Sequence, residues 1–258
     1  MKTIGKALLI GIVLIATSFV VLATPAYAQT IVSTVTLATP LDGISSVTAD
    51  IIATHDQSIT GVIDAAGYDI AVYVPPGVTG VTIGSSSIST EIYGATMVGV
   101  YADGTSRGPS ATDVTVTDTS IYQIGNHASD GTYAPNGAQY GWDIVFAYGV
   151  TGIISGNNIY EYQKAGIVLL GSVDVSITDN TVTGNGPINY IAQNGIEVDY
   201  GASSTVRGNT ITANEYTGGS WTAVGLLLYD VNPSMNFHSQ NHYRDDQTNF
   251  YIYGTAHS

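Results

Sequence analysis

The sequence predicts an all-β chain wound into a right-handed parallel β-helix, a solenoid of about seven coils, on three observations. Apolar and polar residues alternate in short runs, as in residues 175–178 and again in residues 196–199, which is the period of a strand with one buried face. The pattern returns along the chain in one register. Extra residues between its copies fall at one place in the repeat, which a solenoid tolerates because each coil contacts only its neighbours.

Each copy of the repeat holds a strand of the form V-x-I, a turn, a resumed apolar position and, after a loop of variable length, another strand. Examples of this later strand are GIVLLG from Gly166 and GIEVDYG from Gly195. Aligned on the turn, the copies are centred on Ser86, Thr119, Asn157, Asn180, Asn209 and Asn241. Their spacings of 33, 38, 23, 29 and 32 residues keep a minimum length of about one coil.

Asparagine recurs at these turns, and its positions predict a structural stack of Asn157, Asn180, Asn209 and Asn241. If the side chains point inward, they can bond backbone groups and one another along the stack. Such bonds would satisfy turn amides that would otherwise be buried without partners. The alternative is that asparagine only tolerates the left-handed backbone of a tight turn.

Residues 1–28 have the features of an export signal. Lys2 and Lys6 precede an uncharged run, and Ala26-Tyr27-Ala28 forms a small-x-small cleavage site before Gln29. The alternative is an uncleaved anchor, because the run is nearly long enough to span a bilayer. We expect cleavage, and hence a secreted or cell-surface protein with no membrane insertion once the signal is removed.

The remaining chain divides into two predicted parts. Residues 29–67 show a weaker pattern and are predicted to form an N-terminal cap and a degenerate first coil, because the open end of a β-helix must cover its strand edge. Residues 68–258 are predicted to form the β-helix itself. The chain has no cysteine, so an exported fold of this kind must depend on burial and backbone pairing.

Charge limits the classes of partner. The chain has 6 Lys and Arg against 20 Asp and Glu, a formal net charge of −14. Loss of the predicted signal leaves four positive residues, which are Arg107, Lys164, Arg207 and Arg244. An acidic surface repels phosphate backbones and anionic lipid, so nucleic-acid binding is not expected. Of the four, only Arg207 is expected near the coil of Glu197, which favours a neutral or weakly charged glycan over an acidic polysaccharide.

Three long loops, residues 125–141, 184–194 and 214–222, are predicted to leave the same corner of consecutive coils and form one wall. The later strands should also present an outward apolar strip, which a glycan, a partner or the chain's own loops would cover. Aromatic rings suit sugar faces because they combine an apolar face with a polar edge or tip. The predicted glycan-binding residues are Tyr133, Tyr140, Trp142, Tyr190, Tyr216, Trp221, Tyr229, Tyr251 and Tyr253.

Glu197 and Asp199 form the sharpest candidate for chemistry. They stand two apart on one strand and both should point outward, where the neighbouring coils have apolar residues. Desolvation and mutual repulsion should raise their pKa values, and paired carboxyl groups are what glycoside hydrolysis uses. With Asp143 they are the candidate catalytic residues. The alternatives are that they solubilise an exposed strand or bind calcium; no other cofactor or metal is predicted.

The repeat resembles the right-handed parallel β-helix superfamily, which includes pectate lyases, polygalacturonases and the R-type mannuronan epimerases. The resemblance covers roughly residues 70–254 and rests on the V-x-I-x-x-N-x-I units, the GIxVxxG strands and the asparagine positions, which are similar to the asparagine ladder of those proteins. It implies the fold but not an activity, because the same repeat serves lyases, hydrolases, epimerases, adhesins and binding proteins.

The catalytic motifs of those enzymes are absent. The chain lacks the polygalacturonase combination of Asn-Thr-Asp, Asp-Asp and Gly-His-Gly, and the Asp-Pro-His of the epimerases. The sequence therefore predicts a non-catalytic module that binds a polysaccharide or glycan, or that adheres to other surface proteins or to copies of itself. The alternative is a small polysaccharide hydrolase or lyase with its cleft over Glu197 and Asp199.

Overall fold

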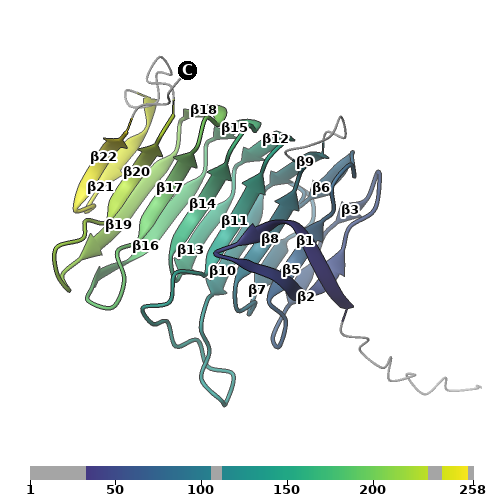
Figure 1. Ribbon diagram of the computed structural model, residues 1–258, viewed down its shortest axis with the longest axis horizontal. Helices are drawn as coiled ribbons and strands as arrows, with labels where there is room; N and C mark the ends of the chain where they lie inside the picture. Colours follow the sequence, from purple (N-terminus) through teal and green to yellow (C-terminus); the bar gives the residue numbers. More distant parts are fainter. Residues whose placement is uncertain (1–32, 106–111, 232–239, 255–258) are drawn as a thin grey trace, which may run out of the picture. The chain divides into compact units, whose positions relative to one another are not determined.

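The computed structural model describes residues 33–105, 112–231 and 240–254, and their regular structure consists of β-strands. The predicted export signal, residues 1–28, lies outside these ranges. Among the described residues, no helix is long and apolar enough to cross a bilayer. The strands form three sheets, which we call A, B and C (Figure 1).

Sheet A has nine strands. In spatial order they are β1 (Ser33–Leu41), β2 (Ile44–Ile52), β5 (Ile70–Val74), β8 (Val98–Asp103), β11 (Trp142–Ala147), β14 (Ala165–Leu170), β17 (Asn194–Asp199), β20 (Val224–Tyr229) and β22 (Thr248–Tyr253). The pair β1 and β2 is antiparallel, whereas each later strand pairs in parallel with the next.

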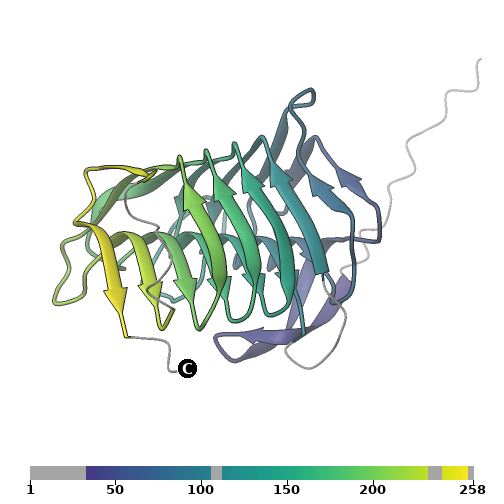
Figure 2. The ribbon, with the colours of Figure 1, turned by 90° about the horizontal axis from the view of Figure 1, so that it is seen from above.

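Sheets B and C are parallel and complete the coils. Sheet B has six strands, which are β18 (Ser203–Arg207), β15 (Asp174–Thr178), β12 (Val150–Ser155), β9 (Thr112–Thr117), β6 (Val81–Ile83) and β3 (Ser58–Ile59). Sheet C has seven, which are β21 (His242–Arg244), β19 (Thr210–Tyr216), β16 (Thr181–Ile188), β13 (Asn158–Tyr162), β10 (Thr119–Ile124), β7 (Thr90–Tyr93) and β4 (Val62–Asp64). The chain visits B, C and A in turn, which makes a parallel β-helix (Figure 2).

Aliphatic side chains in register build the interior. Ile144, Ile167, Ile196 and Leu226 follow one another across sheet A, and each is fully buried. The alternation of the sequence places these residues inward and their neighbours outward. Each coil thus adds an apolar layer that is covered by the coils on either side.

The asparagines form a continuous ladder at the corner between sheets B and C. The Oδ1 of Asn180 accepts hydrogen bonds from the backbone N of Asn157 at 3.0 Å and from its Nδ2 at 2.9 Å. Asn209 does the same for Asn180, and Asn241 for Asn209. The left-handed backbone of these turns falls on the preceding residues, Gly156, Asp179 and Gly208, so it does not explain the asparagines.

The predicted cap segment, residues 29–67, contains β1 to β4. Its strands β1 and β2 form a hairpin that pairs with β5 at the edge of sheet A and also covers outward side chains of later strands, because Leu37, Val47, Tyr101 and Val168 share one buried cluster. Asp103 anchors the hairpin by accepting hydrogen bonds from Ala38 N at 2.6 Å and Thr39 N at 3.0 Å. The hairpin therefore covers outward side chains of the first coils.

The three long loops leave at the corner between sheets C and A (Figure 1). A glutamine of the next coil ties the base of the first and of the third loop. Gln163 Oε1 accepts from the backbone N of Asn126 and Asn136, at 3.1 and 3.0 Å. Gln247 Oε1 accepts in the same way from Tyr216 and Ala223, at 3.2 and 2.9 Å. The first and third loops are thus held to the coils at defined points.

Candidate functional site

Two adjacent rows of outward side chains cross sheet A, and together we call them the outer strip. One row runs Tyr73, Tyr101, Val145, Val168, Glu197, Leu227 and Tyr251. The other runs Asp103, Ala147, Leu170, Asp199, Tyr229 and Tyr253. The register predicted around Glu197 and Asp199, with leucine, valine and tyrosine beside them, is the register of the structure.

The strip divides into a covered and an open half. The hairpin buries the residues of the first coils, from Tyr73 to Val168. On the last coils Leu227 and Tyr229 are half-buried, and Tyr251 and Tyr253 are about half exposed, at 49% and 52%. The sequence predicted a strip that something covers, but the cover over its first half is the hairpin rather than the long loops.

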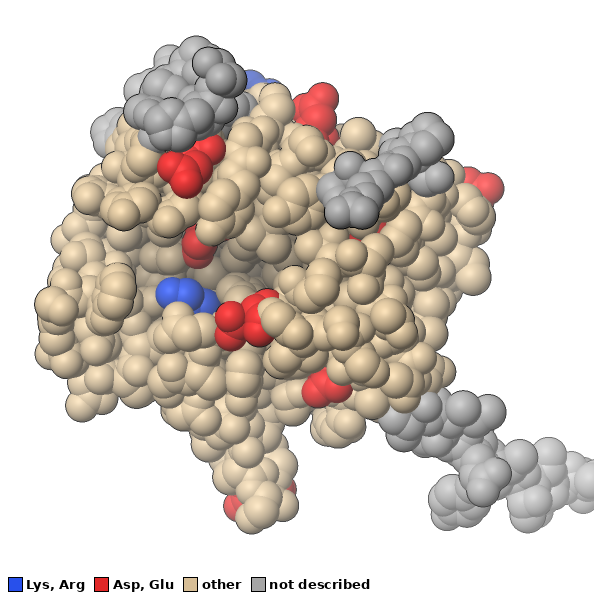
Figure 3. Space-filling view, viewed as in Figure 1, with Lys and Arg blue, Asp and Glu red and all other residues tan. Residues whose placement is uncertain are grey.

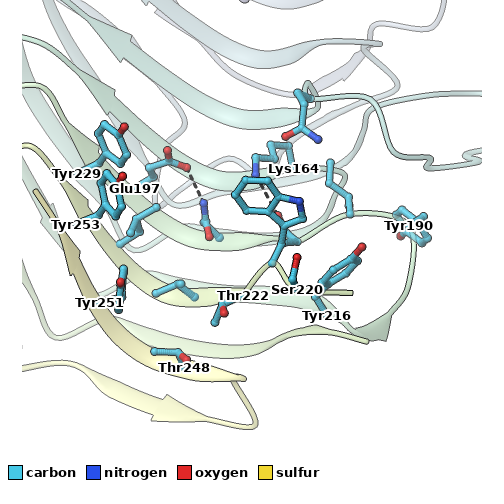
Figure 4. Close-up of a pocket in the computed structure, with 17 residues that line it drawn as sticks. Lys164, Tyr190, Glu197, Tyr216, Ser220, Thr222, Tyr229, Thr248, Tyr251 and Tyr253 are labelled. Carbon is cyan, nitrogen blue, oxygen red and sulfur yellow. Dashed lines mark hydrogen bonds between the residues drawn. The ribbon is translucent and has the colours of Figure 1, made fainter. Parts of the chain in front are cut away.

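A cleft of about 900 Å³ lies over the open half of the strip. Its floor comes from β17, β20 and β22, and its far wall comes from the second and third loops. Figure 4 shows Tyr229, Tyr251 and Tyr253 along one side, Tyr216 and Tyr190 along the other, and Lys164 between them. The other lining residues are Gln139, Ile191, Ala192, Asn194, Glu197, Ser220, Trp221, Thr222, Val224, Leu227 and Thr248.

Six of the nine predicted glycan-binding residues line this cleft: Tyr190, Tyr216, Trp221, Tyr229, Tyr251 and Tyr253. Trp221 is 76% exposed, which is far more than packing in a core allows. Tyr229 and Tyr253 stack with ring centroids 4.8 Å apart, because they stand at equivalent places on neighbouring strands. Their stacked rings present edges and hydroxyl groups to the cleft, whereas Trp221 presents more of its surface.

Glu197 lies at the cleft and Asp199 beside it. The Asn194 amide donates a hydrogen bond from Nδ2 to Glu197 Oε2 at 2.8 Å. Asp199 is buried, with only 4% of its surface exposed, and its Oδ1 has no hydrogen-bond partner among the described residues. Burial, and then the neighbouring Glu197 carboxylate with which it hydrogen-bonds, raise the pKa of Asp199 far above its usual range. Burial therefore favours the protonated form of Asp199.

The predicted rise in the pKa of Asp199 through desolvation and the neighbouring Glu197 is confirmed. Its burial excludes the alternative in which Asp199 solubilises an exposed strand, and its row continues into Leu170 and Tyr229 on the adjacent strands. Of the two predicted carboxyl groups, Glu197 is the one that lines the cleft.

Lys164 is a site residue that sequence reasoning missed. It lies directly before β14, one coil from Glu197, and its Nζ donates to the Ala192 carbonyl at 3.0 Å. Lys164 makes no ion pair with any described residue. The ion pair found among those residues joins Arg244 and Asp245. Figure 3 shows positive charge at a hollow in a mostly uncharged face, with acidic side chains beside it. Arg207 lies at the end of β18, the strand that follows β17, but in sheet B. The expectation that it is the only cation near the coil of Glu197 is wrong, because Lys164 lines the cleft with Glu197.

Asp143 is not at the cleft, so its predicted catalytic place there is wrong. It is fully buried, and neither carboxylate oxygen has a hydrogen-bond partner among the described residues. It occupies the place in β11 that Gly166 holds in β14, and a Cβ there would meet the core residues Ile159 and Val182. The side chain thus points into the interior, where burial raises its pKa well above the usual range.

Three predicted glycan-binding residues also lie away from the cleft. Tyr133 packs within the first loop against His127, with ring centroids 5.7 Å apart. Tyr140 and Trp142 pack against the cluster beneath the hairpin. The hairpin that partly buries Tyr140 and Trp142 is distant in sequence, so the residues around position 140 do not indicate this burial.

The described residues contain no group of three or more histidine, aspartate or glutamate side chains arranged to hold a metal ion. A calcium ion at Glu197 and Asp199 would therefore need further oxygen ligands from water or from a bound molecule. The residues that the cleft does offer are hydrogen-bonding groups and aromatic rings.

Comparison with known proteins agrees with this architecture. Searches of curated proteins and of solved structures gave no match. The chain does match the family model described as "Right handed beta helix region", over residues 59–245. That match spans the coils from β3 to β21, including β17 and Lys164. The chain belongs to the right-handed β-helix family.

Proposed function

We propose that this protein binds a glycan in the cleft over the last coils, as a non-catalytic module that acts outside the cell or on its surface. The observation that supports this most is a long open cleft with six aromatic side chains around a floor of hydrogen-bonding groups. Sugar rings need both, because their faces are weakly apolar and their edges carry hydroxyl groups.

The charge of the chain supports the same conclusion. A net charge of −14 repels nucleic acid and anionic lipid, and Lys164 is the one basic residue at the cleft. A purely apolar ligand would remove solvent from Glu197 and Lys164 and leave each with only its one hydrogen bond within the protein, at a free-energy cost. A hydroxyl-rich ligand replaces the water around both.

The experiment is a binding panel. The protein, with residues 1–28 removed, is passed over immobilised neutral and acidic polysaccharides, with calcium and with a chelator. Trp221→Ala and Tyr251→Ala should lose retention. Tyr122→Ala is the matched control, since Tyr122 lies in a stacked tyrosine row on sheet C, outside the cleft. Retention of no polysaccharide, or equal loss in the control, would contradict glycan binding and direct attention to protein partners.

Glycan cleavage is the second candidate, favoured by the raised pKa of Asp199 beside Glu197. The two groups are in hydrogen-bonding contact, whereas glycoside hydrolysis separates its two carboxyl groups by about 5 Å or more. Direct contact therefore suits a single proton-sharing unit better than a separate acid and nucleophile. Mass spectrometry of the retained polysaccharides decides this. Products that vanish in the double variant Glu197→Gln with Asp199→Asn would establish an enzyme.

A further inference from the structure

The polar floor of the cleft carries one basic and one acidic side chain. These are Lys164 and Glu197, whereas Asp199 is buried. The whole chain, in contrast, is strongly acidic, with a net charge of −14. A polymer with a carboxylate on every sugar would meet long-range repulsion, and a single lysine would be its only compensation at the site.

Glu197 is held in place before any ligand arrives. The Asn194 amide donates to its Oε2 at 2.8 Å. Asn194 is itself buried, with 5% of its surface exposed, and its backbone N donates to the Lys164 carbonyl at 3.0 Å. A carboxylate has about four acceptor positions, so Glu197 retains free ones toward the cleft. These positions accept only from donors, and a sugar hydroxyl is such a donor.

Lys164 supplies the complementary group. One of its three N–H donors is used by the Ala192 carbonyl, and the side chain borders the cleft. A neutral sugar ring presents neighbouring hydroxyl groups, each able to donate and to accept. One can donate to Glu197 while another accepts from Lys164.

We propose that the cleft selects a neutral sugar through Glu197, held in place by Asn194, and Lys164. This inference rests on the proposed glycan binding and names the class of glycan. A uronate ring would direct its carboxylate toward the Glu197 carboxylate or compete with it for Lys164. Either arrangement loses a charge-assisted hydrogen bond.

The test uses polymers that differ only in the carboxyl group. Polygalacturonate and polyglucuronate are compared with the same polymers after their carboxyl groups are reduced to primary alcohols, by affinity electrophoresis at low salt. We expect the protein to bind at least one reduced polymer about tenfold or more tightly than its acidic parent, as loss of one charge-assisted bond predicts. Equal or tighter binding of the acidic parent would overturn the proposal. If neither form of any polymer bound, the glycan proposal itself would fail and this one with it.

Discussion

The covered and open halves of the outer strip have similar side chains with different roles. Those of the covered half hold the hairpin, and those of the open half border the cleft. In the first coils Tyr101 and Asp103 hold a strand of the chain itself, because Asp103 accepts from two backbone N–H groups and the Tyr101 hydroxyl donates to the Thr39 carbonyl at 2.6 Å. In the last coils Asp199 occupies the same row, yet its Oδ1 lacks a partner among the described residues. Asp103, which accepts from backbone N–H groups, stabilises the fold. Asp199, whose Oδ1 has no such donor among the described residues, lies beside the cleft.

The largest difference between the halves should come from adding a charge to each. Val168 and Leu227 flank Glu197 in one row, but Val168 is 4% exposed under the hairpin cluster and Leu227 borders the cleft. Val168→Glu should destabilise the fold by about 3 to 5 kcal/mol, because it buries a charge without a partner. Leu227→Glu should cost about 1 kcal/mol or less. Chemical denaturation measures both, and similar losses would mean that the hairpin does not seal the first half.

Removal of the anchor comes next. Asp103→Ala should destabilise the protein by about 2 to 4 kcal/mol, because it leaves the N–H groups of Ala38 and Thr39 and the Tyr73 hydroxyl without their acceptor. The hairpin should then become the first site of proteolytic cleavage, which mass spectrometry of the fragments locates. Asp118→Ala, at an exposed turn, is the control. A variant with unchanged melting and cleavage would show that apolar packing alone holds the hairpin.

Removal of the buried acid Asp199 should raise stability instead of lowering it. Asp199→Leu is expected to stabilise the protein by about 1 to 2 kcal/mol at pH 7, because a buried acid with a raised pKa resists ionisation in the folded state. The sign follows from linkage: the original chain is at no disadvantage below the ordinary pKa of 3.8, and it loses stability relative to the variant as pH rises above that value.

Thermal unfolding from pH 3 to pH 9 measures this difference between the two chains. The charged or titratable groups around Asp199 are Glu197, Lys164, Asp230, Tyr200 and Tyr229. They are unchanged in the variant, so the difference between the two curves reports Asp199 and its coupling to them. A gap that stayed constant with pH would show that the acid is ionised when folded.

The smallest effect should separate the tyrosines of the two halves. Tyr251→Ala should weaken glycan binding by about 1 kcal/mol and hardly change stability, because its ring is half exposed in the cleft. Tyr101→Phe should leave binding unchanged and cost about 1 kcal/mol of stability through its lost bond to Thr39. Calorimetry with the retained glycan and thermal unfolding measure the two quantities. A binding loss in Tyr101→Phe would mean that the covered half takes part in recognition.

Alternation in the sequence was sufficient to predict which residues share a row. Glu197 stands between Val168 and Leu227, as the repeat indicated, because register follows from a period of two and a constant turn. Exposure could not be predicted in this way. Burial of Val168 depends on a hairpin more than a hundred residues earlier, and its own polar-apolar pattern does not state which surface it packs on.

The wrong prediction for Asp143 and the omission of Lys164 both have local causes. Alternation breaks at the start of β11, where Asp143 replaces a glycine that in β14 leaves room for core side chains. Lys164 stands at a corner just before a strand, where a period of two no longer gives the direction of a side chain. A signal was present nonetheless, because a lysine one coil from Glu197 is rare in a chain with so few basic residues.

The hairpin also sets where the open part of the outer strip ends. Because β1 and β2 occupy the outer face over the first coils, a ligand that runs across the strands can extend only as far as the hairpin permits. Neighbouring strands are about 4.8 Å apart, so each strand that the hairpin leaves uncovered lengthens the groove by that amount. A change in hairpin length would therefore alter the length of the open groove without altering any residue that lines the cleft.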